Sequence, residues 1–336
     1  MVKSPMTARC RFQLVLIKPS HYDDDGYVIR WWRAMIPSNS LAALYAIAAD
    51  CAKRLVLGPD VAIDIEAIDE TNTRIDVPAL LARFRSHSNF GLVGLVGVQS
   101  NQYPRALDIA RPFRDAGIQV AMGGFHVSGC LSMLDGHAVD LDACRDMGIA
   151  MFAGEAEGRL DKVLQDAAGG RLALLYDFMK DLPGIEGTPV PFLPKRYVAR
   201  TLGLSASFDA GRGCPYQCSF CTIINVQGRK SRYRSADDVE HVCTAHANAI
   251  GCIRREAQDV ACKRDDALSL PGKQHLAIFG DLVLALLGRG EIVRVDIFQS
   301  NEHPPTLPGA QVAKHEARRI AWTPEAKWPP RRRARR

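Results

Sequence analysis

The sequence lacks any long uninterrupted hydrophobic run. A membrane-spanning helix needs ~18 consecutive apolar residues, whereas the longest apolar run, near residues 275–288, is interrupted by Asp281. The first residues, MVKSPMTARCRF, contain neither the apolar segment nor the small-residue cleavage site of a secretory signal peptide. From these absences we expect a cytoplasmic protein that does not interact with membranes.

The sequence also has little net charge outside its C-terminal tail. The formal net charge is +6, but residues 311–336 contain nine Lys and Arg against two Asp and Glu, so the preceding residues sum to −1. A basic tail of this kind is typical of a solvated terminus, whereas a folded nucleic-acid surface requires basic residues on the folded domains. We therefore expect no specific nucleic-acid partner.

Aromatic residues are few, at 7%, yet 47% of the residues are apolar and 24% are charged, which excludes collagen-like, low-complexity and disordered chains. Apolar runs suited to buried strands alternate with helical patterns up to about residue 168. The expected strands are residues 12–17, 61–69, 90–98, 118–124 and a fifth from 149; the expected helices begin after Ser38 or Ser40, after Asp76, and at residues 103, 127 and 158. This alternation predicts an α/β fold with a flavodoxin-like, doubly wound, five-stranded parallel sheet that binds ligands beyond the carboxyl ends of its strands.

Composition divides the rest of the chain. Four prolines in a short span within residues 169–200 predict an extended linker. A strand, a cysteine loop, a basic segment and a helix opened by Ser235 follow, and they predict one unit of a second α/β domain. The expected divisions are a first domain at 1–168, a linker at 169–200, the start of a second domain at 201–251, a divergent region at 252–310 and a disordered basic tail at 311–336.

Three of the ten cysteines, Cys214, Cys218 and Cys221, lie together in GRGCPYQCSFC. Three thiolates on one tight loop can each bind one iron of a 4Fe-4S cube, which leaves the fourth iron free to chelate S-adenosylmethionine (SAM). A zinc site is the alternative, but zinc loops usually bring a second cysteine pair ~12 to 20 residues away. No such pair is present, so the spacing favours the cluster.

This loop resembles the cluster loop of the radical SAM enzymes, in which the position of Phe220 packs beside bound SAM. The first half of the chain resembles the cobalamin-binding domain of the B12-dependent subgroup, through GGFHVSG at 123–129 and GEAEG at 154–158. By itself, GGFHVSG is also typical of an ordinary turn from strand to helix. The resemblance covers roughly residues 10–250 and implies a 4Fe-4S cluster, SAM and cobalamin as cofactors. It assigns these residues to the cobalamin side: Gly123, Gly124, His126, Ser128, Gly129, Gly154 and Glu155.

Two details depart from the patterns of related domains. Cobalamin domains with a histidine ligand use Asp-x-His-x-x-Gly, whereas His21 is accompanied by Pro19 and Asp24, so we expect that His21 does not bind cobalt. The ~85 residues after Gly251 are too few for five more strand-helix units of ~30 residues each, so we expect a partial (β/α) barrel, truncated or shifted in reading frame near Cys252.

The resemblance implies an enzyme that cleaves SAM reductively and transfers a methyl group to an unactivated carbon of a small-molecule substrate. A flavodoxin or ferredoxin is the expected electron donor. Radical cyclisation or rearrangement is an open alternative, and so is a cobalamin-binding protein with a non-catalytic radical SAM remnant. Arg229, Lys230, Arg232 and Arg234 either meet an anionic substrate or form a solvated basic face.

Overall fold

The computed structural model describes residues 10–134, 141–201, 208–216, 218 and 221–241. These residues belong to the first of the two units into which the chain divides, 1–300 and 301–336. The regions predicted at 252–310 and 311–336, and most of the strand predicted before the cysteine loop, lie outside the described residues. None of the described helices is long and apolar enough to cross a bilayer.

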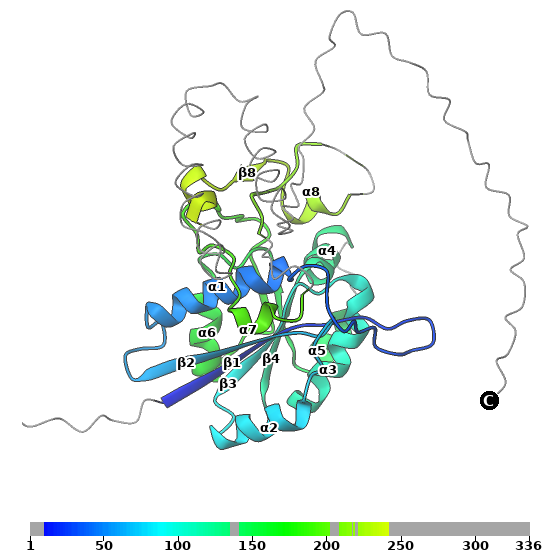
Figure 1. Ribbon diagram of the computed structural model, residues 1–336, viewed down its shortest axis with the longest axis vertical. Helices are drawn as coiled ribbons and strands as arrows, with labels where there is room; N and C mark the ends of the chain where they lie inside the picture. The colour runs from blue at the N-terminus through cyan, green and yellow to red at the C-terminus, as the bar shows by residue number, and fades with distance from the viewer. Residues whose placement is uncertain (1–9, 135–140, 202–207, 217, 219–220, 242–336) are drawn as a thin grey trace, which may run out of the picture. The chain divides into compact units, whose positions relative to one another are not determined.

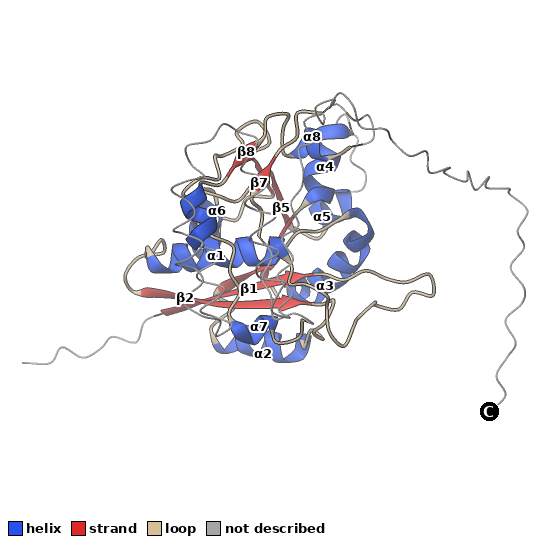
Figure 2. Cartoon of the chain, turned by 45° about the horizontal axis from the view of Figure 1, so that its top comes forward, coloured by secondary structure: helices blue, strands red, loops and turns tan. Residues whose placement is uncertain are grey.

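A six-stranded parallel sheet organises the first part of the chain (Figure 2). Its order is β2-β1-β3-β4-β5-β6, and every neighbouring pair is parallel. The strands are β1 Cys10–Lys18, β2 Val61–Asp69, β3 Gly91–Leu95, β4 Gln119–Gly123, β5 Ala150–Ala153 and β6 Leu175–Asp177. The predicted α/β fold with a parallel sheet is therefore confirmed, and all six carboxyl ends face the same edge of the sheet.

Helices cover both faces of this sheet, with α1 and α6 on one side and α2 and α3 on the other (Figure 1). The helices are α1 Asn39–Lys53, α2 Val77–Ser86, the 3-10 helix η1 Ser100–Gln102, α3 Tyr103–Asp115, α4 Phe125–Met133, α5 Asp142–Asp146, α6 Leu160–Ala168, α7 Lys195–Val198 and α8 Ile223–Val226. The predicted caps are present: the Ser38 hydroxyl accepts from the Leu41 amide at 3.3 Å, and the Asp76 carboxylate accepts from the Ala79 amide at 3.0 Å.

Alternate residues of β1 divide between two apolar clusters. Val15 and Ile17 pack with α2, α3 and α4, whereas Phe12, Leu14 and Leu16 pack with α1 and α6. A strand covered on both faces needs apolar residues at successive positions, and FQLVLI supplies them. Each fully buried side chain of this size contributes roughly 1.5 to 3 kcal/mol by leaving water.

The expectation of five strands is wrong, because β6 comes from the segment predicted as a linker. Leu175–Asp177 is only three residues long, with Tyr176 buried between two exposed residues, and three residues are too few to reveal a strand pattern in the sequence. Its place in the sheet is set by pairing with β5, in which Phe152 lies opposite Tyr176. The sequence likewise does not predict the short helices α5, α7 and α8, since four or five residues are too few to show a helical period.

A small two-stranded antiparallel sheet follows the linker, formed by β7 Gly211–Arg212 and β8 Arg232–Tyr233. We call it the β7–β8 hairpin, although the cysteine loop and α8 lie between its two strands. The sequence did not predict it, because two-residue strands leave no pattern. The predicted helix after Ser235 is confirmed through residue 241. Ser235 and Asp238 cap it reciprocally, each side chain accepting from the other residue's amide at 3.1 Å.

Candidate functional site

The carboxyl ends of β3, β4 and β5 bring the two glycine motifs of the first domain together. The Val98 amide donates to the Gly123 carbonyl at 3.0 Å, and the His126 amide donates to the Val98 carbonyl at 2.9 Å. Gly124 has φ of +142°, and a Cβ there would lie 2.3 Å from the Val98 nitrogen. Only glycine fits such a contact between two backbones, which explains Gly124, the second glycine of the pair at the end of β4.

His126 and Ser128 lie on α4 and are almost completely buried. His126 stacks on Tyr103 with ring centroids 4.1 Å apart, and its Nδ1 lies 3.2 Å from the Ser100 hydroxyl. The Ser128 hydroxyl accepts from the Gly154 amide at 3.1 Å and so links the two glycine motifs. These predicted site residues therefore lie together, and their polar atoms contact this chain's own groups.

The β7–β8 hairpin is anchored to the second motif by buried charges. Arg212 donates to Glu157 at 2.7 and 3.0 Å, to Glu155 at 3.1 Å, and to Asp209. Its cross-strand neighbour Arg232 holds both oxygens of Glu155, at 2.5 and 2.7 Å. Burial lowers the pKa of the Arg212 guanidinium, but Asp209, Glu157 and Glu155 outweigh burial and raise this pKa above its ordinary value. Arg212 therefore stays charged inside the cluster.

Arg234 completes this ionic cluster. Its side chain is fully buried and lies 3.7 Å from Asp209. It donates to the Asp209 carbonyl at 3.0 Å and to the Thr188 hydroxyl at 3.2 Å. Of the two alternatives for the basic segment, the solvated face is thus wrong for Arg232 and Arg234, whose charges are matched by buried carboxylates. Arg229 and Lys230 are exposed.

The cysteine loop leaves the hairpin immediately after Arg212. Gly213 has φ of +82°, and the Cys214 amide donates to the Gly228 carbonyl at 3.1 Å. Cys214 and Cys221 are partly buried and Cys218 is exposed. Phe220, predicted to pack beside SAM, lies outside the described residues.

The three thiols share a loop, but they do not converge. Within the described part of the chain, no group of three or more His, Cys, Asp or Glu side chains is gathered so as to hold a metal ion. The residue types fit an iron-sulfur cluster, because three cysteines are the protein ligands of such a cluster with one open iron. Binding requires the three sulfur atoms to draw together from the positions described.

The other end of the cysteine loop packs on the first motif. Thr222 follows Cys221 and precedes α8, and α8 lies beside α4 (Figure 2). A Cβ on Gly129 of α4 would lie 3.5 Å from the Thr222 methyl group. Ile224 and Val226 of α8 are buried. Both ends of the cysteine loop are therefore seated on the loops that the resemblance assigned to cobalamin.

Sequence reasoning missed Asp209, Glu157 and Arg212 as residues of this site. In the sequence, GEAEG stands out through its glycines and Glu155, and the basic segment lies far from it along the chain. A signal was present, since Arg212 lies two residues before Cys214 and Glu157 lies two residues after Glu155. Only the fold brings these separated segments into contact.

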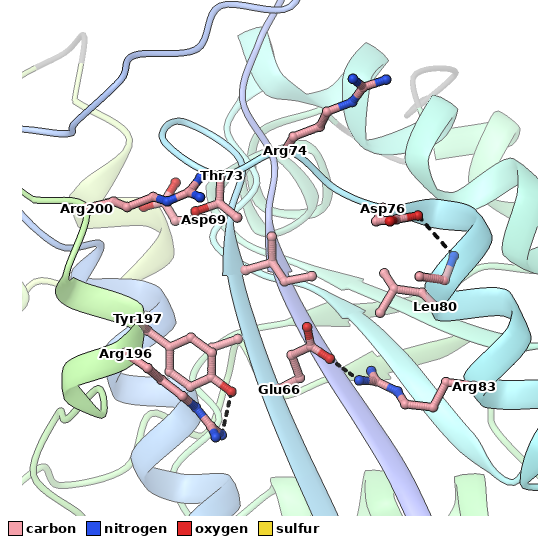
Figure 3. A pocket seen from close by; sticks show the side chains of 13 residues that line it. Glu66, Asp69, Thr73, Arg74, Asp76, Leu80, Arg83, Arg196, Tyr197 and Arg200 are labelled. Carbon is pink, nitrogen blue, oxygen red and sulfur yellow. Dashed lines mark hydrogen bonds and ion pairs between the residues drawn. The ribbon is translucent and has the colours of Figure 1, made fainter.

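A cavity of about 370 Å³ lies elsewhere, between β2, α2 and α7 (Figure 3). Glu66 forms an ion pair with Arg83 inside it, and Arg196 donates to the Tyr197 hydroxyl at 2.8 Å. Four arginines and three carboxylates line it, so its charges nearly balance. None of the predicted site residues lines this cavity, and we treat it as the gap left where α7 covers the edge strand β2.

Comparison with known proteins gives partial matches. Over 154 residues the chain is 29% identical to bacteriochlorophyllide d C-8(2)-methyltransferase of Chlorobaculum tepidum, a match that covers 44% of this chain and 32% of that enzyme. The matched stretch thus spans about a third of the length of this curated relative. Models of known protein families give no match.

Two solved structures resemble the chain remotely. The radical S-adenosylmethionine methyltransferase TsrM from Kitasatospora setae, with cobalamin and a [4Fe-4S] cluster bound, has a TM-score of 0.44 at 15% identity over 70% of this chain and 46% of TsrM. The cobalamin-dependent S-adenosylmethionine radical enzyme OxsB, with aqua-cobalamin and S-adenosylmethionine bound, has a TM-score of 0.44 at 14% identity over 71% of this chain and 32% of OxsB. At these TM-scores the likeness carries no inference about function.

Proposed function

We propose that this chain is a B12-dependent radical SAM protein that transfers a methyl group to an unactivated carbon of a small-molecule substrate. The observation that carries this proposal is the Cys-x3-Cys-x2-Cys loop, seated at both ends on the carboxyl edge of the parallel sheet. The similarity to a curated methyltransferase over 154 residues agrees with a methyl-transfer reaction.

In this proposal Cys214, Cys218 and Cys221 hold the cluster as thiolates. The cluster, when bound, supplies the electron that cleaves a carbon-sulfur bond of SAM. Gly213 allows the chain to turn sharply before Cys214, because its φ of +82° disfavours other residues. The Cys214 amide, bound to the Gly228 carbonyl, fixes the first ligand relative to the hairpin.

Corrinoid binding at the same edge of the sheet is part of the proposal. The space beside the motif glycines at 123, 124, 129 and 154 is filled by the chain's own atoms, from Phe152, Val98, Thr222 and Phe178 respectively. The side chains of Ser128 and Glu155 are likewise bound internally. The residues present thus leave no open cradle at these positions, and we assign no corrinoid contact to a single side chain.

The test is anaerobic reconstitution of the full chain with iron and sulfide, followed by hydroxocobalamin, a reductant and SAM. We expect a cluster absorbance that is lost in Cys218→Ala and retained in Cys10→Ala, since Cys10 is also an exposed cysteine but lies outside the loop. We also expect 5′-deoxyadenosine in the wild-type reaction. A cluster that does not depend on the three cysteines contradicts the proposal. A cluster without SAM cleavage, together with corrinoid binding, favours the alternative of a cobalamin-binding protein with a non-catalytic radical SAM remnant.

A further inference from the structure

The ionic cluster beside the cysteine loop contains six charged side chains withdrawn from water. Arg212, Arg232 and Arg234 are 12%, 14% and 0% exposed, and Glu155, Glu157 and Asp209 are 7%, 3% and 12% exposed. Three positive charges are thus matched by three negative ones. Removing one partner from such a buried group leaves an uncompensated charge, so each member depends on the others.

The two glutamates hold both strands of the hairpin at once. Arg212 and Arg232 lie opposite each other in the β7–β8 pair, and Glu155 accepts from both. Glu157 accepts from both terminal nitrogens of Arg212. Since Arg212 is two residues before Cys214, these carboxylates fix the point where the cysteine loop begins relative to the end of β5.

We propose that Glu155 and Glu157 are positioning residues for the cysteine loop: by holding Arg212 and Arg232, they fix the place of Cys214, the ligand toward which the other two cysteines move when a cluster binds. This inference rests on the proposed function, because it assumes that the loop is a cluster site. It gives GEAEG a role that the resemblance did not: the motif's acidic side chains face the hairpin arginines of the same chain.

The test compares Glu155→Gln and Glu157→Gln with Glu70→Gln in the full chain. Glutamine keeps the shape of the side chain and removes its charge. Glu70 is a matched control, because it follows β2 as Glu155 follows β5, its side chain is 1% exposed, and it forms an ion pair with Arg105 at 2.6 Å. Any general destabilisation caused by neutralising a buried carboxylate therefore affects the control as well.

The first readout does not require a cluster. The measurement is amide hydrogen exchange of metal-free protein, in peptides that cover residues 209–216 and 228–234. In both variants we expect this exchange to be about tenfold faster or more. A tenfold change corresponds to a fall of ~1.4 kcal/mol in the free energy of local opening. We expect no change of these peptides in Glu70→Gln. Unchanged exchange in both variants, or equal acceleration in the control, overturns the proposal.

The second readout is specific to the cluster. In reconstituted protein we expect iron to pass to a chelator about tenfold faster in both variants than in wild type, a difference of ~1.4 kcal/mol in opening. The electron paramagnetic resonance signal of the reduced cluster should also shift in the variants and not in Glu70→Gln. If the wild-type chain binds no cluster, the proposed function fails while hydrogen exchange still decides whether the glutamates hold the hairpin. Faster exchange with an unchanged cluster signal and iron release rejects the positioning role.

Discussion

The parallel sheet and the β7–β8 hairpin are held in opposite ways. The sheet packs apolar side chains such as Phe12 and Phe113, both fully buried, between two layers of helices. The hairpin is held to the sheet by charged side chains centred on Arg212. Apolar packing responds to changes in side-chain volume, whereas a buried ionic cluster responds to the loss of a single charge.

This contrast implies that the two regions can be perturbed separately. A change in the core should lower the stability of the whole sheet, because the apolar clusters on its two faces share the same strands. A change in the hairpin should open the cysteine loop and leave the sheet folded, since the sheet and its helices are complete without it.

The largest effect is expected from Phe113→Ala. Phe113 of α3 is fully buried and packs edge-on against Phe84, with ring centroids 6.3 Å apart. Its truncation leaves a cavity and should lower the free energy of unfolding by ~3 to 5 kcal/mol. The measurement is urea unfolding followed by circular dichroism, with Tyr27→Ala as the control because Tyr27 is 73% exposed. An equal loss in both variants would contradict the assignment of Phe113 to the core.

The thiols of the two regions should differ in reactivity. Burial, together with the hydrogen bond to Asp161, raises the pKa of the Cys51 thiol to about 12, so almost none of it is thiolate at neutral pH. Cys218 is exposed on the cysteine loop. In metal-free protein we expect iodoacetamide to alkylate Cys51 at least ~100-fold more slowly than Cys218. Peptide mass spectrometry measures both rates, which should become similar in denaturant; similar rates in the folded protein would refute the difference.

Gly213→Ala should open the hairpin without unfolding the sheet. Its φ is +82°, and the new Cβ would lie 2.2 Å from the Lys230 carbonyl oxygen. We expect a local cost of ~1 to 3 kcal/mol, seen as faster exchange of the Cys214 amide. Gly187→Ala is the control, because Gly187 has φ of +68° but open space around it. Exchange at Cys214 that stays at the wild-type rate would show that the hairpin tolerates the added methyl group.

The smallest effect is expected from Asp161→Asn, which removes a charge from the surface of the sheet domain. Hydrogen bonds from Arg54, at 2.5 and 2.7 Å, hold the pKa of Asp161 below its ordinary value. A carboxylate whose pKa is lowered by folding stabilises the protein above its unfolded pKa of ~3.9, and this stabilisation is lost as the pH falls through the folded pKa.

We therefore expect Asp161→Asn to cost ~0.5 to 1 kcal/mol at neutral pH, the range of a partly exposed ion pair. The difference from wild type should shrink as the pH falls below the ordinary range of Asp. Thermal unfolding at several pH values measures it, with the exposed Asp24→Asn as the control. A difference that stays constant down to acidic pH would show that the Asp161 charge is not its source.

Much of the sheet could be predicted from particular residues. The apolar run FQLVLI predicts β1, and Asp76 predicts the start of α2. Both predictions succeed because strand burial and helix capping depend on residues that are neighbours in the sequence. β6 and the hairpin could not be predicted. Their strands are two or three residues long, and pairing with a distant strand, such as Phe152 with Tyr176, decides that they form.

The candidate site divides in the same way. The sequence by itself determined that three cysteines share one short loop, because the spacing of Cys214, Cys218 and Cys221 is a local property of the chain. Only the tertiary structure decided that Glu155 and Glu157 hold the arginines beside that loop, across 57 and 55 residues of sequence. The physical reason is that a buried charge must be paired, and the fold decides which opposite charge lies beside it. No local sequence pattern specifies that partner.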